Sequence, residues 1–201
     1  MNKDEIVEQT RLAFDYIQKL YFEVSYLIKE MEGLLAEEEP AFILLRPSGY
    51  QIINRSSNGL EPYNVNLWLM RKFAVAFGLE ESTPIKRGQT ITKLEPDIKV
   101  IYLRIILNDI DNPEPMIYSG VLHNFEKKTP LKSWPTKFEQ LLTTFEYQET
   151  RVFSDPSSIN YEDKSVCFNG RLFNTPLYDI NSSEVLYKKL IQPSIKLYNQ
   201  I

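Results

Sequence analysis

The chain has few of the residues on which common catalytic and metal sites depend. Its 201 residues include one cysteine, one histidine and seven glycines. A single cysteine excludes an internal disulfide and a cysteine-rich zinc site, and it fits a reducing compartment. A single histidine leaves classical zinc hydrolysis without its second ligand. The glycines form neither G-x-G-x-x-G nor G-x-x-x-x-G-K-[ST], so these nucleotide-binding motifs are excluded.

The chain also lacks long hydrophobic runs and an excess of basic residues. No apolar run approaches the roughly 18 residues of a membrane span, and the first residues are acidic and amphipathic, unlike a signal peptide. We therefore expect a cytoplasmic protein without a membrane segment. The net charge of −4 argues against a nucleic-acid partner, because general affinity for polyanions comes from clustered lysine and arginine.

The overall composition is that of one globular domain. Hydrophobic residues make up 43% of the chain and charged residues 25%, which is ordinary globular usage. A chain of 201 residues lies within the size range of one domain. We therefore predict a single domain over residues 1–201.

A heptad pattern predicts one long amphipathic helix from about Asp4 to Leu35. Three of the seven columns are apolar, which is the width of a stripe that packs on a core, whereas a coiled coil needs two. The columns hold Thr10, Ile17, Val24 and Met31, then Ile6, Ala13, Leu20, Leu27 and Leu34, and then Val7, Phe14, Tyr21, Ile28 and Leu35. The acidic run and proline at 37–40 end the helix, with Gly33 as an earlier alternative.

From Ala41 the apolar period changes to two, which predicts strands. Residues 42–46 and 50–55 are expected to form a hairpin, residues 65–77 are interpreted as a strand although a helix also fits, and residues 80–95 as a loop. The clearest strands are 97–107 and 116–126. Pairing them antiparallel with Ile101 opposite Leu122 collects apolar residues on one face, as in a half-buried sheet.

Three further segments complete the predicted fold. Ser133 caps an expected helix near 134–147. The dipeptide Asn169-Gly170 predicts a hairpin between 164–168 and 171–175. Asn181 and Glu184 resemble a capping box that opens a helix near 182–198, which Pro193 kinks or ends. The order of elements predicts an α+β fold, in which the long N-terminal helix and these two helices pack a mainly antiparallel sheet of about six to seven strands.

One group of residues could support catalysis. Pro96-Asp97 precedes one of the clearest strands and Glu126-Lys127-Lys128 ends the other. In the register above, Asp97 lies opposite Glu126, and Lys128 shares their side of the sheet. This arrangement resembles the PD-(D/E)xK site of metal-dependent nucleases, which implies Mg²⁺ and a water that attacks a phosphodiester. Charged residues at the wet end of a hairpin are the favoured interpretation, so no cofactor is expected outside this alternative.

We interpret the other residues with reactive or metal-binding side chains as structural. His123 lies in the middle of a strand, and Cys167 lies in an apolar stretch where a thiol usually packs as a small hydrophobe. Oxygen ligands that suit a hard cation gather in one turn, but the glycine of the EF-hand pattern is missing, so we interpret the turn as solvated. These ligands are Asp109, Asp111, Asn112 and Glu114.

The predicted N-terminal helix is longer than the domain that it should pack against. At 1.5 Å per residue it spans about 48 Å, whereas a compact domain of this size is about 40 to 45 Å across. The helix must therefore cross the domain, bend or protrude. Leu12, Phe22 and Tyr26 are apolar but lie off the stripe, so we expect them to contact a second surface.

These observations favour a non-enzymatic protein-interaction or assembly subunit with a protein partner or a homo-oligomeric state. A nuclease that uses Asp97, Glu126 and Lys128 is one alternative. A small-ligand sensor with residues 80–95 as a lid is the other.

Overall fold

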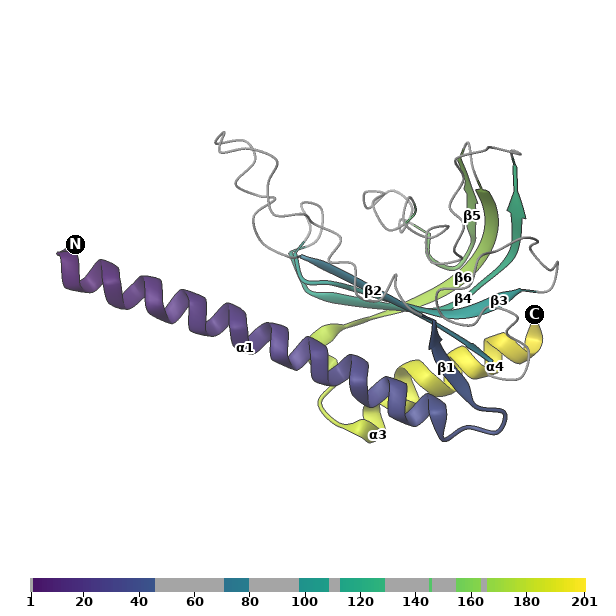
Figure 1. Ribbon diagram of the computed structural model, residues 1–201, viewed down its shortest axis with the longest axis horizontal. Helices are drawn as coiled ribbons and strands as arrows, with labels where there is room; N and C mark the ends of the chain where they lie inside the picture. The colour runs from purple at the N-terminus through teal and green to yellow at the C-terminus, as the bar shows by residue number, and fades with distance from the viewer. Residues whose placement is uncertain are drawn as a thin grey trace.

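The computed structural model describes residues 2–45, 71–79, 98–108, 113–128, 145, 155–163 and 166–201. These residues form one six-stranded antiparallel sheet, a long N-terminal helix and a C-terminal helical segment. Figure 1 shows both helical segments on the same side of the sheet, with the N-terminal helix extending far beyond it. The predicted α+β class and the mainly antiparallel sheet are therefore confirmed.

The N-terminal helix α1 (Lys3–Ala36) confirms the long helix predicted from the heptad pattern. It begins with a capping box, in which the Asn2 side chain accepts from the Glu5 amide and the Glu5 carboxylate accepts from the Asn2 amide, both at 2.9 Å. Gly33 does not end the helix. The amide of Glu37 donates to the Gly33 carbonyl at 3.2 Å, and this bond closes the last turn.

The sheet has the strand order β1-β2-β3-β4-β6-β5. The strands are β1 (Phe42–Leu45), β2 (Lys72–Leu79), β3 (Lys99–Ile106), β4 (Met116–Lys127), β5 (Ile159–Glu162) and β6 (Val166–Pro176). Strand β2 confirms the strand interpretation of 65–77 for its last residues, and β1 confirms a strand at 42–46, with β2 as its described partner. The predicted strand at 50–55 and the loop at 80–95 lie outside the described residues, as does the helix at 134–147 except for Phe145.

The predicted register between β3 and β4 is wrong by one residue. Ile101 pairs with Val121 rather than with Leu122. The prediction assumed a half-buried sheet, but nearly every residue of β3 is buried, and the apolar residues of β3 and β4 are shared between two cores. Where both faces are apolar, alternation no longer distinguishes one register from the next.

The hairpin predicted around Asn169-Gly170 is also wrong, because both residues lie inside the continuous strand β6. They pair with β4 on one side and with β5 on the other. A Cβ on Gly170 would lie 2.5 Å from Leu122 Cδ2, so glycine serves close strand packing here and not a turn. Asn169 donates to the Asn160 side chain at 2.6 Å, which satisfies its amide within the sheet.

The C-terminal segment starts with a 3₁₀ turn, η4 (Leu177–Asp179), and continues as α3 (Ser183–Leu186), a π turn η5 (Tyr187–Ile191) and α4 (Gln192–Gln200). The N-cap is Ser182, one residue after the predicted Asn181, and its hydroxyl accepts from the Val185 amide at 3.3 Å. The helix does not end at Pro193. The π turn directly before it is a common way for a helix to accommodate the missing amide and the ring of a proline.

Two apolar cores lie on opposite faces of the sheet. One contains Tyr102, Phe145, Tyr161 and Phe168, whose rings contact one another with centroids 4.9 to 5.6 Å apart. The other joins the sheet to α1 and to the C-terminal segment through Met31, Leu35 and their neighbours. Hydrophobic burial on this second face therefore holds the later part of α1 on the domain.

A buried pair of hydroxyls links the C-terminal helix to the sheet. Ser194 donates to the Leu190 carbonyl at 2.6 Å, and its oxygen lies 2.8 Å from that of Ser119. Both serines are fully buried. Because the Ser194 hydrogen is used on Leu190, Ser119 is the donor in the pair.

Replacing Ser194 with alanine is expected to lower the free energy of unfolding by about 1 to 3 kcal/mol, because it leaves the buried Ser119 hydroxyl without an acceptor. Ser119→Ala should cost less, because Ser194 keeps its bond to Leu190. The double variant should lose less than the sum of the two single variants. Urea unfolding of all four proteins measures these differences, and strictly additive losses would contradict the proposed bond.

Candidate interaction surface

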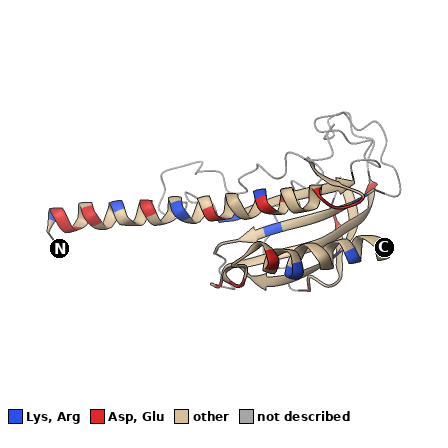
Figure 2. Cartoon of the chain, turned by 90° about the horizontal axis from the view of Figure 1, so that it is seen from below, with Lys and Arg blue, Asp and Glu red and all other residues tan. Residues whose placement is uncertain are grey.

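The first half of α1 projects away from the domain with an apolar stripe on its surface. Figures 1 and 2 show this half extending past the end of the sheet. All residues from 2 to 14 are exposed, whereas Val24, Met31 and Leu35 later in the helix are buried. The projecting stripe, as we name it, continues the same heptad columns and consists of Ile6, Val7, Thr10, Ala13 and Phe14.

The exposure of the large side chains on the projecting stripe is unusual for residues of their type. Ile6 is 47% exposed, Val7 59% and Phe14 67%. A contiguous exposed apolar strip of this kind typically marks a site of protein contact. Sequence reasoning missed this surface, because the three-column stripe was assigned along its whole length to packing on the helix's own domain.

The charged residues of the projecting half lie outside the projecting stripe. Arg11 lies 2.6 Å from Glu8 and 3.2 Å from Asp15, one turn away on either side. The hydrogen bond from Arg11 lowers the pKa of Glu8. Figure 2 shows acidic and basic residues following each other along the helix. Such pairs support an exposed helix only weakly, but they leave the projecting stripe free of charge.

The interaction residues predicted from the sequence all lie exposed on α1. Leu12 is 52% exposed, Phe22 53% and Tyr26 67%. The rings of Phe22 and Tyr26 stack with centroids 6.5 Å apart, and Leu12 lies in the projecting half. Their exposure agrees with a second contact surface, while the contact itself remains a prediction.

A groove lies where the projecting half of α1 meets the domain. This groove, which we name the α1–α3 groove, has a volume of about 730 Å³. Its apolar wall on α1 continues the projecting stripe, and its other wall is the segment from η4 to α3. Leu20, Glu23, Val24 and Leu27 line it on α1, and Leu177 and Ile180 line it on the opposite wall. The Tyr178 hydroxyl is hydrogen-bonded to Tyr16, which joins η4 to α1 and raises the pKa of Tyr178.

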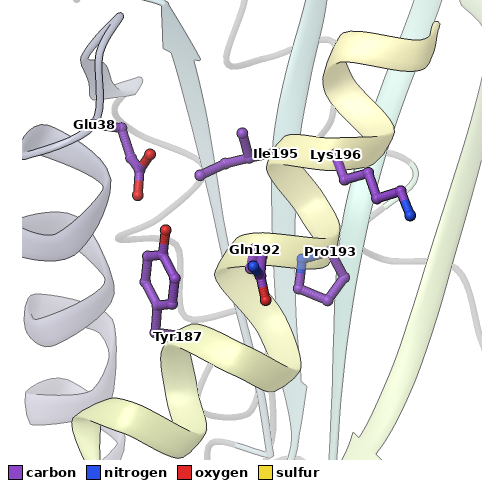
Figure 3. Close-up of a pocket in the computed structure, with 6 residues that line it drawn as sticks. All are labelled: Glu38, Tyr187, Gln192, Pro193, Ile195 and Lys196. Atoms are coloured by element: carbon purple, nitrogen blue, oxygen red, sulfur yellow. The ribbon is translucent and has the colours of Figure 1, made fainter.

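A second hollow, of about 580 Å³, lies between the end of α1 and the C-terminal helix. It is lined by Glu38, Tyr187, Gln192, Pro193, Ile195 and Lys196. Figure 3 shows the Tyr187 hydroxyl directed toward the carboxylate of Glu38. That hydrogen bond raises the pKa of Tyr187 and ties the residues after α1 to the C-terminal segment. The hollow therefore lies at a packing contact between the residues after α1 and the C-terminal segment.

The structure places two of the three candidate catalytic residues near each other. Glu126 lies at the end of β4 and Lys128 directly after the strand, beyond an irregularity in the pairing of β4 with β6 between His123 and Glu126. Lys128 forms an ion pair with Glu162 of β5. Asp97 lies outside the described residues, and the register that placed it opposite Glu126 is off by one. The complete three-residue site therefore remains a prediction.

Cys167 lies beside Glu126, a neighbour that no local pattern in the sequence predicts. The Cys167 thiol donates to the Glu126 carboxylate at 3.7 Å, and both line a hollow of about 290 Å³. Burial and the negative charge of Glu126 raise the pKa of this thiol, which keeps it protonated and a poor nucleophile. Cys167 is half-buried, less than predicted for a buried hydrophobe.

Within the part of the chain that the structure describes, no three His, Cys, Asp or Glu side chains are grouped so as to hold a metal ion. Of the predicted oxygen-ligand turn, only Glu114 is described, and it is exposed. No described helix is long and apolar enough to cross a membrane.

Comparison of the chain with protein-family models, with curated proteins and with solved structures finds no match. The projecting stripe is a run of exposed apolar side chains, and the α1 wall of the α1–α3 groove continues it.

Proposed function

We propose that the protein is a non-enzymatic interaction or assembly subunit that binds another protein surface through the projecting half of α1. The observation that carries the proposal is the exposed stripe, because the columns of Val24, Met31 and Leu35 continue to Thr10, Phe14 and Val7 without a covering surface in the described structure. An amphipathic helix gains its stability mainly by burying its apolar face. A partner would complete that burial.

Charge and helix capping support the same proposal. The ion pairs of Arg11 and the capping box at Asn2 and Glu5 stabilise the projecting half as a helix before any partner binds. A helix that is already formed loses less conformational entropy on association than a segment that folds on binding. Leu12, Phe22 and Tyr26 supply a second apolar surface that an assembly with more than one contact can use.

The test compares wild type with Phe14→Glu and with Lys19→Gln as the matched control. Both changes make an exposed position of α1 more negative by one charge, but Phe14 lies on the projecting stripe and Lys19 on the opposite face of the helix. We expect wild type and Lys19→Gln to form the same complex, with themselves or with a partner from native lysate, and Phe14→Glu to lose it at least about tenfold. Light scattering and quantitative affinity capture measure this loss.

One outcome of this test would contradict the proposed function. If wild type stays monomeric over a wide concentration range and retains no protein that Phe14→Glu fails to retain, the projecting stripe is not an interaction surface. Circular dichroism of all three proteins shows whether α1 remains helical, so that a lost complex cannot be ascribed to unfolding.

A further inference from the structure

We infer that the projecting stripe binds the projecting stripe of a second copy of this chain, antiparallel and about a two-fold axis at Ala13. The inference rests on the interaction function proposed above and names its partner. In this arrangement the first turn of each α1 reaches the α1–α3 groove of the other copy. The same surface is used on both copies, as in the isologous interfaces of two-fold dimers.

The distribution of charge permits the chain to bind itself. The projecting stripe has no charged residue, and the positions beside it include Gln9, Tyr16 and Gln18. Arg11 borders the stripe, one turn from Val7 and from Phe14, and its charge is balanced within the same chain by Glu8 and Asp15. Two acidic chains can therefore bring the centres of their stripes together without an unpaired charge beside Ala13.

The sizes of the side chains favour a crossing at Ala13. Thr10 and Ala13 are the small members of the stripe, and small residues let two helices approach closely. Ile6 and Leu20 lie seven residues before and after Ala13, in the same heptad column. An antiparallel pair centred at Ala13 consequently brings Ile6 of one copy to Leu20 of the other, at the wall of the α1–α3 groove.

Charge complementarity at the ends of the contact distinguishes antiparallel from parallel packing. Lys3 lies ten residues before Ala13 and Glu23 ten residues after it, and Glu23 lines the groove. Antiparallel packing therefore brings Lys3 of each copy near Glu23 of the other. Parallel packing would instead place Lys3 near Lys3 and Glu23 near Glu23, which is repulsive.

The extent of the contact predicts a dimer of modest affinity. Residues 3–20 form a helix about 27 Å long and about 10 Å wide. Two such helices bury on the order of 1,000 Å² in total, which is close to the lower limit for a specific interface. The dimer should therefore depend on protein concentration, and the groove contacts of Ile6 add apolar burial at each end.

Cysteine cross-linking tests the inferred arrangement. The background variant is Cys167→Ser, which removes the native thiol, and Ile6→Cys and Leu20→Cys are added separately. In the antiparallel dimer the two Ile6 positions are about 21 Å apart, beyond disulfide reach. We expect mild oxidation to link Ile6→Cys with Leu20→Cys in a mixture and to link neither protein with itself.

The other cross-linking outcomes overturn the inference. Efficient self-linking of Ile6→Cys and of Leu20→Cys would show parallel packing. Absence of links in the mixture and in both single variants would show that the stripes do not meet.

A charge exchange provides a second, independent measurement. Sedimentation at low ionic strength should show dimerisation of Lys3→Glu about 3- to 30-fold weaker than that of wild type, because two exposed ion pairs become repulsive. Lys3→Glu combined with Glu23→Lys should restore it. Equal affinity of wild type and Lys3→Glu would contradict the proposed neighbours.

The sedimentation data also separate this inference from the proposed function. If wild type is monomeric but a lysate partner is retained by wild type and lost by Phe14→Glu, self-association is refuted and the interaction function stands. If neither a dimer nor such a partner is found, both proposals fail.

Discussion

Gly120→Ala is expected to lower the free energy of unfolding by about 3 kcal/mol or more. A Cβ at this position would lie 2.1 Å from the carbonyl oxygen of Arg171 and 2.8 Å from the Cα of Leu172. Both atoms belong to the backbone of β6, which pairs with β4 and β5 and so cannot move without breaking the sheet. Urea unfolding followed by far-ultraviolet circular dichroism measures the loss.

Gly33→Ala is the matched control, because it makes the same chemical change inside α1. Nothing lies within 4 Å of the Cβ that it adds, and the residue is exposed. Alanine restricts the unfolded chain and favours the helix, so stability should rise by about 0.5 to 1 kcal/mol. Similar small effects at Gly120 and Gly33 would refute the close approach of β4 to β6.

The second large effect is expected from Leu35→Glu, which should lower the free energy of unfolding by about 3 to 5 kcal/mol. Leu35 is completely buried between α1 and the sheet, in the core that contains Ile101 and Leu190. Glutamate there loses the apolar contacts and places a carboxylate in a site lined by hydrophobic side chains. Chemical unfolding monitored by circular dichroism tests this value.

Phe14→Glu makes the comparable change 21 residues earlier in the same heptad column. Because Phe14 is 67% exposed, the free energy of unfolding of the monomer should change by no more than about 0.5 kcal/mol. The difference between the stability losses of Leu35→Glu and Phe14→Glu shows how far along α1 the domain covers the stripe. A large loss of monomer stability in Phe14→Glu would mean that the stripe is already covered within one chain.

Much of the fold could be predicted because local patterns report local structure. The heptad columns predicted α1 to within a residue at each end, since each turn of a helix repeats its own apolar spacing. Alternating apolar residues located β3 and β4 for the same reason. The absence of the nucleotide-binding glycine motifs and the single histidine and cysteine likewise argue against whole classes of site, because those sites need residues that the sequence lacks.

Features that depend on a neighbouring strand were predicted less well. Asn169-Gly170 has the composition of a turn, but the close packing of Leu122 on Gly170 shows why glycine is needed in the middle of β6. The register of β3 and β4 could not be read from alternation, because both faces of the sheet are buried. The proximity of Cys167 to Glu126 follows from that same strand pairing and has no local signal.

The long N-terminal helix shows which features follow from local sequence pattern and which follow from tertiary packing. The amino-acid sequence by itself predicted one amphipathic helix from about Asp4 to Leu35 with a continuous apolar stripe, because helical periodicity is a property of neighbouring turns. Only the tertiary structure decided that the stripe is buried at Leu35 and exposed at Phe14, because burial depends on where the sheet ends. The same side-chain pattern thus anchors one half of the helix and leaves the other half exposed.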